Sequence, residues 1–183
     1  MKKALLVIFL SFSISFSIAQ SDETIKNKYT FPQIGWIFSA PDSFKLIDSS
    51  STRLNPTTEI EIWRKQLMFT NNRNSLILSI TKSSQKGIDW ENIHKKEEKH
   101  FFDQSRIRQP SIQFDSLSTN LKIDSRIFAK FVVTGKENGK IVRNHVQLSS
   151  YINGYRFYIV YEFSDKEFQE QIEKSIMNGK FVY

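Results

Sequence analysis

The sequence has 183 residues, of which 39% are hydrophobic and 25% charged, so it can form one domain with a buried core. Six glycines, four prolines and no cysteine exclude a collagen-like fibre, a disulfide scaffold and a thiolate metal site. The formal net charge of +7 is a mild basic excess.

The first 20 residues have the composition of a secretory signal peptide. Two lysines precede an uncharged stretch from Ala4 to Ile18, and Ala19 supplies the small residue of a cleavage site. A helix needs about 20 apolar residues to span a membrane, so this stretch is short for an anchor. We expect residues 1–20 to be removed and the mature protein to be exported, to the periplasm or the extracellular space, without a transmembrane segment.

The next segment predicts an arm followed by short strands. Residues 21–33 are polar and terminal, and we expect a flexible arm ahead of a single domain over residues 34–183. Gly35 to Ala40 alternates in polarity and predicts a strand, and Pro41 begins a turn. Phe44 to Ile47 predicts a second short strand.

The segment that follows is harder to interpret. Residues 48–52 are small and polar, which predicts a loop. For residues 57–66, Pro56 and the spacing of the apolar side chains favour a short helix, whereas alternating isoleucine and glutamate favour a strand. We prefer the helix. Residues 67–70 and 75–82 then predict the two arms of a hairpin.

Two helices are predicted by their start signals. Asp89 caps the first helix, which ends before Pro110. The second begins near residue 165, where Ser164 and Glu167 have the spacing of a capping box. Its buried stripe repeats every four residues: Phe168, Ile172 and Ile176.

Two Asn-Gly pairs, at residues 138–139 and 153–154, separate strongly strand-like runs. Asn-Gly is the preferred pair of a two-residue type I′ hairpin turn, so Glu137 should pair with Lys140 and Ile152 with Tyr155. Counting outward from both turns gives one almost wholly apolar face, which we assign to the core. Its members are Ile127, Ala129, Phe131, Val133, Asn144, Val146, Leu148, Ser150, Ile152, Tyr155, Phe157, Ile159, Tyr161 and Phe163.

The opposite face of this meander is mixed. The same counting places polar side chains there beside apolar ones such as Val132 and Val160. Because apolar side chains are not normally left in water on this scale, we expect a helix or a bound partner to cover part of this face. The predicted fold is therefore an α+β, three-layer α/β/α sandwich around a mainly antiparallel sheet.

Both ends of this domain resemble a known family. The opening GWIFSAPDSFKLI, and an ending in which NGYRFYIVYEF, a capped helix and KFVY follow one another, are similar to proteins of the Mog/PsbP-like fold, among them small exported Bacteroidetes-type proteins of unknown function. That family includes a Ran-binding nuclear protein and a photosystem subunit, which share a scaffold and no reaction. The resemblance implies a non-enzymatic binding scaffold, and no functional residue transfers from it.

One cross-strand pair suggests chemistry. The second turn places His145 opposite Glu162, and a carboxylate beside an imidazole raises the imidazole pKa and can orient it for acid–base work. The simpler interpretation is an ordinary cross-strand contact. We expect no catalytic residue here, and we take the polar side chains of this face as a binding surface: His145, Glu162, Lys130, Gln147 and Tyr158.

The other histidines do not predict a metal site. His94 and His100 lie six residues apart, about 240° around a helix, so they cannot share an ion. His94 with Glu97 or Glu98 has a ligand-like spacing, but three neighbouring lysines favour a solvated helix face. No glycine-rich nucleotide loop, G-x-S-x-G or H-E-x-x-H motif occurs, and the basic residues are mixed with acidic ones, which argues against nucleic acid.

The sequence thus predicts an exported binding or accessory protein without a cofactor, whose partner is a protein or another component of the cell envelope. The alternatives are a hydrolase-like enzyme that uses His145 and Glu162, and a carrier of a small apolar ligand between helix and sheet. A pocket that reaches His145 would favour the enzyme, and a closed apolar cavity would favour the carrier.

Overall fold

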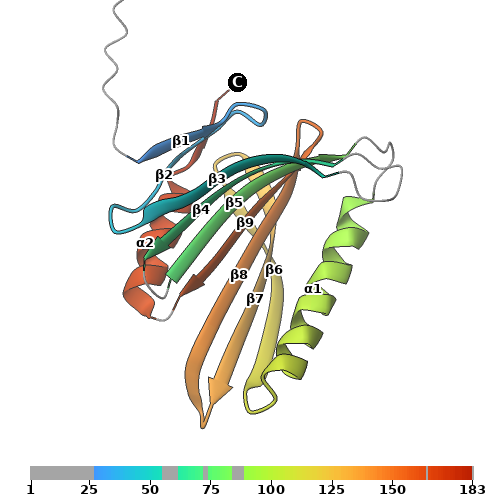
Figure 1. Cartoon of the computed structure of the whole chain (residues 1–183), viewed down its shortest axis with the longest axis vertical. Coiled ribbons are helices and arrows are strands. Elements are labelled where there is room, and N and C mark those ends of the chain that lie inside the picture. Colours follow the sequence, from blue (N-terminus) through green and yellow to red (C-terminus); the bar gives the residue numbers. More distant parts are fainter. Residues whose placement is uncertain (1–26, 55–61, 72–73, 84–88, 164, 183) are drawn as a thin grey trace, which may run out of the picture.

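The computed structural model describes residues 27–54, 62–71, 74–83, 89–163 and 165–182 (Figure 1). Its main feature is a seven-stranded sheet in which all neighbouring strands are antiparallel. From one edge to the other the strands are β3 (Lys45–Leu54), β4 (Ile62–Asn71), β5 (Asn74–Ser83), β9 (Tyr155–Phe163), β8 (Lys140–Ile152), β7 (Arg126–Glu137) and β6 (Gln113–Ile123).

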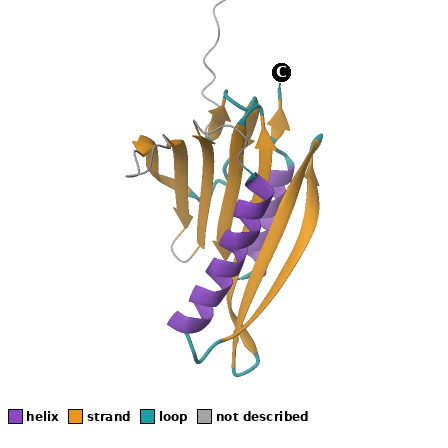
Figure 2. Ribbon diagram, turned by 90° about the vertical axis from the view of Figure 1, so that its right-hand side faces the viewer, coloured by secondary structure: helices purple, strands orange, loops and turns teal. Residues whose placement is uncertain are grey.

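Both faces of this sheet are covered. Helix α1 (Trp90–Arg108) lies over one face, and helix α2 (Lys166–Met177) lies on the other (Figure 2). A small sheet of β1 (Lys28–Phe31), β2 (Trp36–Ser39) and β10 (Lys180–Phe181) shares the α2 side. The predicted α+β sandwich of three layers is confirmed.

Both helices begin at an aspartate. Asp89 Oδ1 accepts a hydrogen bond from the backbone N–H of Asn92 (3.0 Å), and Asp165 Oδ1 accepts one from Phe168 (3.0 Å). The first cap was predicted, whereas the second helix is capped by Asp165 instead of Ser164, which lies outside the described residues. The predicted stripe of α2 is correct, since Ile172 and Ile176 are fully buried and Phe168 packs against the core.

Both Asn-Gly turns form, with positive φ at all four residues. The register across the second turn is as predicted, and it pairs His145 with Glu162. Across the first turn the prediction fails after two pairs, because β8 contains one extra residue at Val142 and Gly135 pairs with Arg143. This β-bulge moves every later pair by one residue.

The bulge inverts the predicted faces of β7. Val132, and not Phe131, lies opposite Val146, so Phe128, Lys130 and Val132 belong to the α2 side of the sheet. Phe131 and Val133 instead pack under α1 with Phe114. The faces predicted for β8 and β9 are correct, because the second hairpin contains no bulge.

Three other expectations are corrected. Part of the expected arm over residues 21–33 forms strand β1, in which Phe31 is fully buried. Residues 48–52 lie within β3 instead of a loop, and from Ile62 onward the segment with a preferred helix is strand β4. In each case backbone pairing with a neighbouring strand decides the conformation and overrides weak local preference. Residues 57–61 and the expected signal peptide, residues 1–20, lie outside the described residues.

The main core lies on the α2 side of the sheet. It is rich in aromatic rings, and Trp36 of β2 lies 4.7 Å from Phe157 of β9 and 5.2 Å from Phe38 between ring centroids. Aromatic pairs of this kind stabilise a core beyond the area they bury. No helix in the described ranges has the length and apolar composition needed to cross a membrane.

Candidate functional site

The face of the sheet under α1 carries three rows of side chains across β4, β5 and β9. Alternate side chains of a strand share a face, so directly paired residues form rows. One row is Arg64, Thr81 and Arg156; the next is Gln66, Ser79 and Tyr158; and the third, Met68, Ile77 and Val160, is apolar. The face therefore changes along the strands from cationic to neutral polar to apolar.

A cleft of about 380 Å³ opens between α1 and these rows. Its floor and walls come from four strands and the helix, and they include two of the predicted binding residues, Gln147 and Tyr158. The lining residues are Arg64, Gln66, Ile77, Ser79, Thr81, Glu97, Phe101, Gln147, Arg156, Tyr158 and Val160.

The cleft contains more hydrogen-bond donors than acceptors. Arg156 is held by the Glu97 carboxylate through two bonds of 3.0 and 2.6 Å, and its guanidinium lies 4.8 Å from the Tyr158 ring centroid. Arg64 makes no hydrogen bond or ion pair with another side chain in the described part of the protein. Burial raises the pKa of Tyr158, so its hydroxyl stays neutral and can donate.

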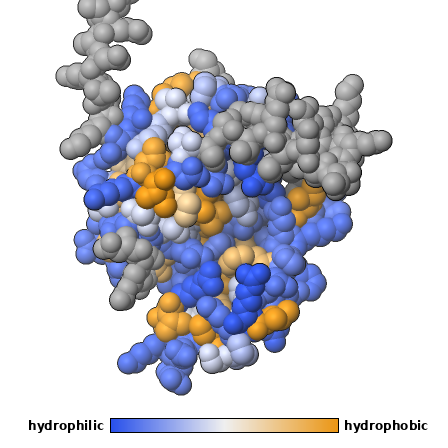
Figure 3. Space-filling view, viewed as in Figure 1, coloured by the Kyte–Doolittle hydropathy of each residue, from blue (hydrophilic) through white to orange (hydrophobic). Residues whose placement is uncertain are grey.

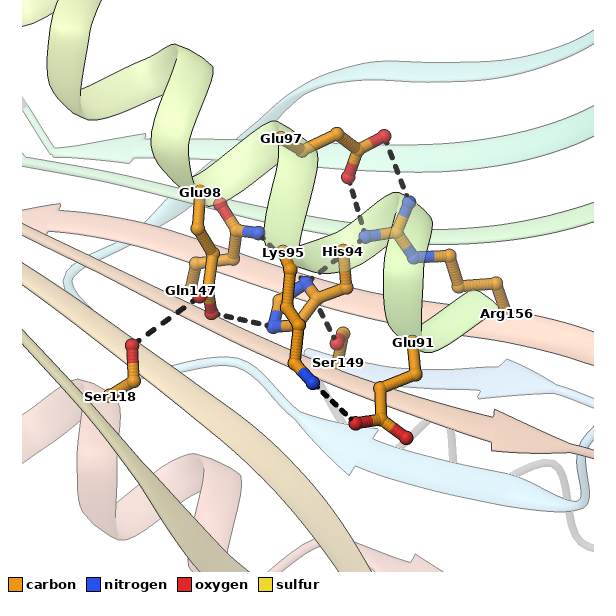
Figure 4. Close-up of polar contacts among 9 residues, drawn as sticks. All are labelled: Glu91, His94, Lys95, Glu97, Glu98, Ser118, Gln147, Ser149 and Arg156. Atoms are coloured by element: carbon orange, nitrogen blue, oxygen red, sulfur yellow. Dashed lines mark hydrogen bonds and ion pairs between the residues drawn. The ribbon is translucent and has the colours of Figure 1, made fainter. Parts of the chain in front are cut away.

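Behind the cleft, His94 anchors α1 to the sheet (Figure 4). Its Nδ1 lies 3.2 Å from Ser149 Oγ, 3.3 Å from an Arg156 nitrogen and 3.4 Å from Gln147 Nε2. Because a guanidinium can only donate, Nδ1 must be the acceptor. The ring proton is therefore on Nε2, which lies 2.7 Å from Glu98 Oε1.

His94 was expected on a solvated helix face, but it is only 6% exposed. Burial lowers its pKa; Glu98 opposes this effect and Arg156 adds to it. The neutral ring is thus the form that fits the site. The lysines that suggested a solvated face point outward, and Lys95 pairs with Glu91 at 2.7 Å.

Ser149, His94 and Glu98 are also arranged like the nucleophile, base and carboxylate of a catalytic triad. Two features argue for a structural role. Arg156 and Gln147 donate to the same nitrogen that would have to activate Ser149. Ser149 is itself buried and does not line the cleft. The cluster positions the helix and Arg156.

The predicted pair of His145 and Glu162 forms, with His145 Nδ1 2.9 Å from Glu162 Oε1. Arg143 Nη2 donates to the same oxygen at 2.8 Å. The hydrogen bond from His145, together with Arg143, lowers the pKa of Glu162 to about 2. The His145 ring lies 3.9 Å from the Phe101 ring in a stacked arrangement and is only 5% exposed, so α1 covers it.

Lys130 does not join the other predicted binding residues. The bulge at Val142 places it on the α2 side, where its Nζ lies 3.7 Å from Glu173 Oε1. It lines a separate, mostly apolar hollow of about 270 Å³ together with Leu148, Tyr161 and Ile176. Of the five predicted residues, Gln147 and Tyr158 line the cleft, His145 and Glu162 lie on the same face beyond it, and Lys130 lies on the other.

Sequence reasoning missed the two arginines of the cleft and His94. Arg64 lies in the segment for which a helix was preferred, and the strand interpretation would have placed it on a face with Gln66. Counting from the second Asn-Gly turn puts Arg156 on the same face as Tyr158, but Arg156 was not among the residues chosen for the binding surface. In the described ranges no group of three or more His, Asp or Glu side chains could hold a metal ion.

Comparisons with known proteins support the fold. No protein-family model matches the sequence, and no curated protein matches it either. Among solved structures, the cyanobacterial PsbP protein CyanoP of Synechocystis is similar, with a TM-score of 0.52, 9% identity, and coverage of 85% of this chain and 91% of that chain. At this identity the likeness concerns the fold alone. The chain thus has the PsbP-like fold: mainly antiparallel sheets flanked by two helices.

Proposed function

We propose that this protein is a non-enzymatic binding or accessory protein whose ligand lies in the cleft between α1 and the sheet. The observation that carries the proposal is the order of the three rows, with Arg64 and Arg156 at one end and Ile77 and Val160 at the other. A ligand that matches this order has an anionic group at one end and an apolar body at the other.

The anionic end is a carboxylate or a phosphate. Arg64 and Arg156 flank Thr81 from the two adjacent strands, so their backbones are about 10 Å apart and their long side chains can converge on one group. Guanidinium groups suit both anions because their donors form a fixed fork. Arg156 is already oriented by Glu97, whereas the Arg64 guanidinium is available to a ligand.

The apolar end follows from the length of the cleft. Arg64 and Met68 are four residues apart on β4, which corresponds to about 13 Å along the strand. Ile77, Val160 and Phe101 line this end. A chain of about eight carbon atoms fits that distance, and the volume of about 380 Å³ is within the range of small-ligand pockets.

Two observations favour binding over the enzymatic alternative. His145 lies under Phe101 and does not line the cleft, so a substrate there has no path to the imidazole. The other buried imidazole, His94, is committed to holding α1 and Arg156. Export to the periplasm or the extracellular space, and a partner in the cell envelope, also belong to the proposal and rest on the composition of residues 1–20.

The test uses octanoate and octyl phosphate as probes. The controls are octanol, which lacks the anionic group, and acetate, which lacks the apolar chain. Calorimetry should show binding of both probes and of neither control. Arg64→Gln should weaken binding at least about tenfold, the factor expected when a charge-assisted hydrogen bond is lost.

Lys45→Gln is the matched control, because Lys45 is also an exposed cation but lies on β3 and does not line the cleft. It should leave the affinity for both probes unchanged. Equal losses in the two variants, equal binding of octanol, or no binding of either probe would each overturn the proposal.

A further inference from the structure

Two segments far apart in the sequence meet at one end of the molecule. Residues 105–113 include the last turn of α1 and the connection to β6, and residues 135–143 form the hairpin between β7 and β8. Both lie at the lower end of the long axis in Figure 1. We call these two segments together the hairpin end.

The hairpin end exposes large aliphatic side chains. Ile107 is 69% exposed, Ile141 56% and Val142 46%. Ile107 and Val142 belong to one surface, because Ile112 lines a hollow of about 690 Å³ with Ile107 and an adjoining hollow of about 420 Å³ with Val142. Ile141 precedes Val142 on the same hairpin. Figure 3 shows hydrophobic residues beside strongly hydrophilic ones at this end.

The same segments are strongly basic. They contain five cationic residues, Arg106, Arg108, Lys136, Lys140 and Arg143, and one acidic residue, Glu137. Asp115 pairs with Lys136 at 2.9 Å and Glu162 pairs with Arg143 at 2.8 Å. No carboxylate of the described residues forms an ion pair with the other three cations, which therefore outnumber Glu137.

We propose that the hairpin end docks on the surface of an anionic lipid bilayer. Exposed aliphatic side chains within a basic rim match the acyl boundary and the headgroup charge of such a surface. Protein interfaces, by contrast, rely on exposed aromatic anchors, and the two segments contain no Phe, Tyr or Trp. Two rings of neighbouring residues line the larger hollow, but Phe114 is buried and the Arg106 guanidinium lies 5.9 Å from the Phe102 ring centroid. The surface also projects at an end of the molecule, where a flat bilayer can reach both segments at once.

The test is co-sedimentation of the full chain with vesicles. We expect binding to vesicles of about two parts phosphatidylcholine to one part phosphatidylglycerol, and little binding to phosphatidylcholine alone. The variant Arg106→Gln/Arg108→Gln/Lys140→Gln should need about a hundredfold more lipid, because each cation near such a surface contributes about fivefold. Added salt should also weaken vesicle binding by the wild type, because it screens the attraction between the cations and the lipid headgroups.

A matched triple variant removes the same charge elsewhere. Lys28→Gln/Lys45→Gln/Lys96→Gln changes exposed lysines outside the hairpin end and should keep vesicle binding within about fivefold of the wild type. All variants carry the same residues 1–26, so any lipid affinity of that segment is common to them. Circular dichroism melting confirms that each variant is folded.

Two further variants separate the alternatives. Ile107→Ser/Ile141→Ser keeps the charge and should still weaken binding, now at high salt as well as low. Arg64→Gln should have no effect, because a lipid headgroup in the cleft is not part of this proposal. The proposal is overturned if the wild type does not bind anionic vesicles, if the two triple variants lose equally, or if Arg64→Gln abolishes binding.

Discussion

The two faces of the seven-stranded sheet differ in how many polar side chains they bury, although both are covered by a helix. On the α2 face, Leu78, Phe157 and Ile159 are fully buried in a continuous apolar and aromatic core. On the α1 face, the buried side chains include the polar groups of Gln147 and Ser149. The first face resembles the interior of any small domain, and the second resembles a ligand-binding site.

Strand β9 shows how one segment serves both faces. Its odd-numbered residues from Phe157 to Phe163 are buried on the α2 side, and its even-numbered residues from Arg156 to Glu162 lie under α1. Apolar burial is non-directional and stabilises the fold. Polar groups that are held by named partners cost more to bury but define positions, which is what a binding site needs.

The largest effect is expected on the α2 face. Phe157→Ala should lower the free energy of unfolding by about 3–5 kcal/mol, because the ring lies among Phe31, Trp36 and Phe128 and nothing can fill the space. Urea unfolding measures the change, and Phe157→Leu, which keeps most of the volume, should lose less. A loss below about 1 kcal/mol for the alanine variant would contradict a tightly packed core on this side.

An intermediate effect is expected where α1 is anchored. His94→Gln should cost about 1–2 kcal/mol at pH 7, because a buried network loses its fitted member. Burial holds the pKa of His94 in the folded state below 6.5, so the unfolded state binds the proton first as the pH falls. Stability of the wild type should therefore fall below about pH 6.5, and the difference between wild type and His94→Gln should narrow.

Unfolding curves of both proteins at several pH values between neutral and mildly acidic test this prediction. The wild type is its own control above the usual histidine pKa, where no change with pH is expected from His94. A difference that stays constant as the solution is acidified would show that His94 is not buried in its neutral form.

A smaller loss of stability, in a more acidic pH range, is expected from Glu162. His145 and Arg143 lower its pKa in the folded state from 4.5 to about 2, so the paired carboxylate stabilises the fold above about pH 4.5. That contribution is lost as the pH falls toward 2. Because the side chain is 36% exposed, solvent screening limits the effect to about 1 kcal/mol or less.

Glu162→Gln isolates this contribution. At pH 7 its free energy of unfolding, measured with urea, should be lower than that of the wild type. The two values should converge in acid. Convergence at near-neutral pH instead would assign the effect to another group.

The smallest effect is expected from Tyr158→Phe, directly beside Phe157 but on the other face. Its hydroxyl faces the cleft, so its removal should change the free energy of unfolding by less than about 1 kcal/mol. The same variant should weaken octyl phosphate binding in calorimetry by a few-fold. A stability loss as large as that of Phe157→Ala would remove the distinction between the two faces.

Local signals in the sequence predicted most of the fold and part of the site. The second Asn-Gly turn placed His145 opposite Glu162, and the structure brings their atoms to 2.9 Å. The first turn was equally clear, yet it misplaced Lys130. One inserted residue at Val142 shifts the register, so the later residues of the pairing lie on the opposite face of β7 from the one predicted. A bulge of this kind leaves little mark on the sequence, since any residue that tolerates a partly exposed position can provide it.

Arg64 and His94 could not be predicted for a different reason. Whether Arg64 faces the cleft depends on β4 being a strand, and the local pattern around it fitted a helix as well. His94 is flanked by lysines that point to solvent, and only the packing of α1 on the sheet shows which side of the helix is covered. Both depend on contacts with distant segments.

By itself, the sequence determined local features of this protein: the two helix starts, the two tight turns and the alternation of side chains along β8 and β9. These depend on neighbouring residues and on backbone geometry, which a short stretch of chain contains. Only the tertiary structure decided that Arg64, Thr81 and Arg156 form one row and that α1 covers it. Pairing of β5 with β9 joins residues about eighty positions apart, and no local preference fixes the register of so distant a contact.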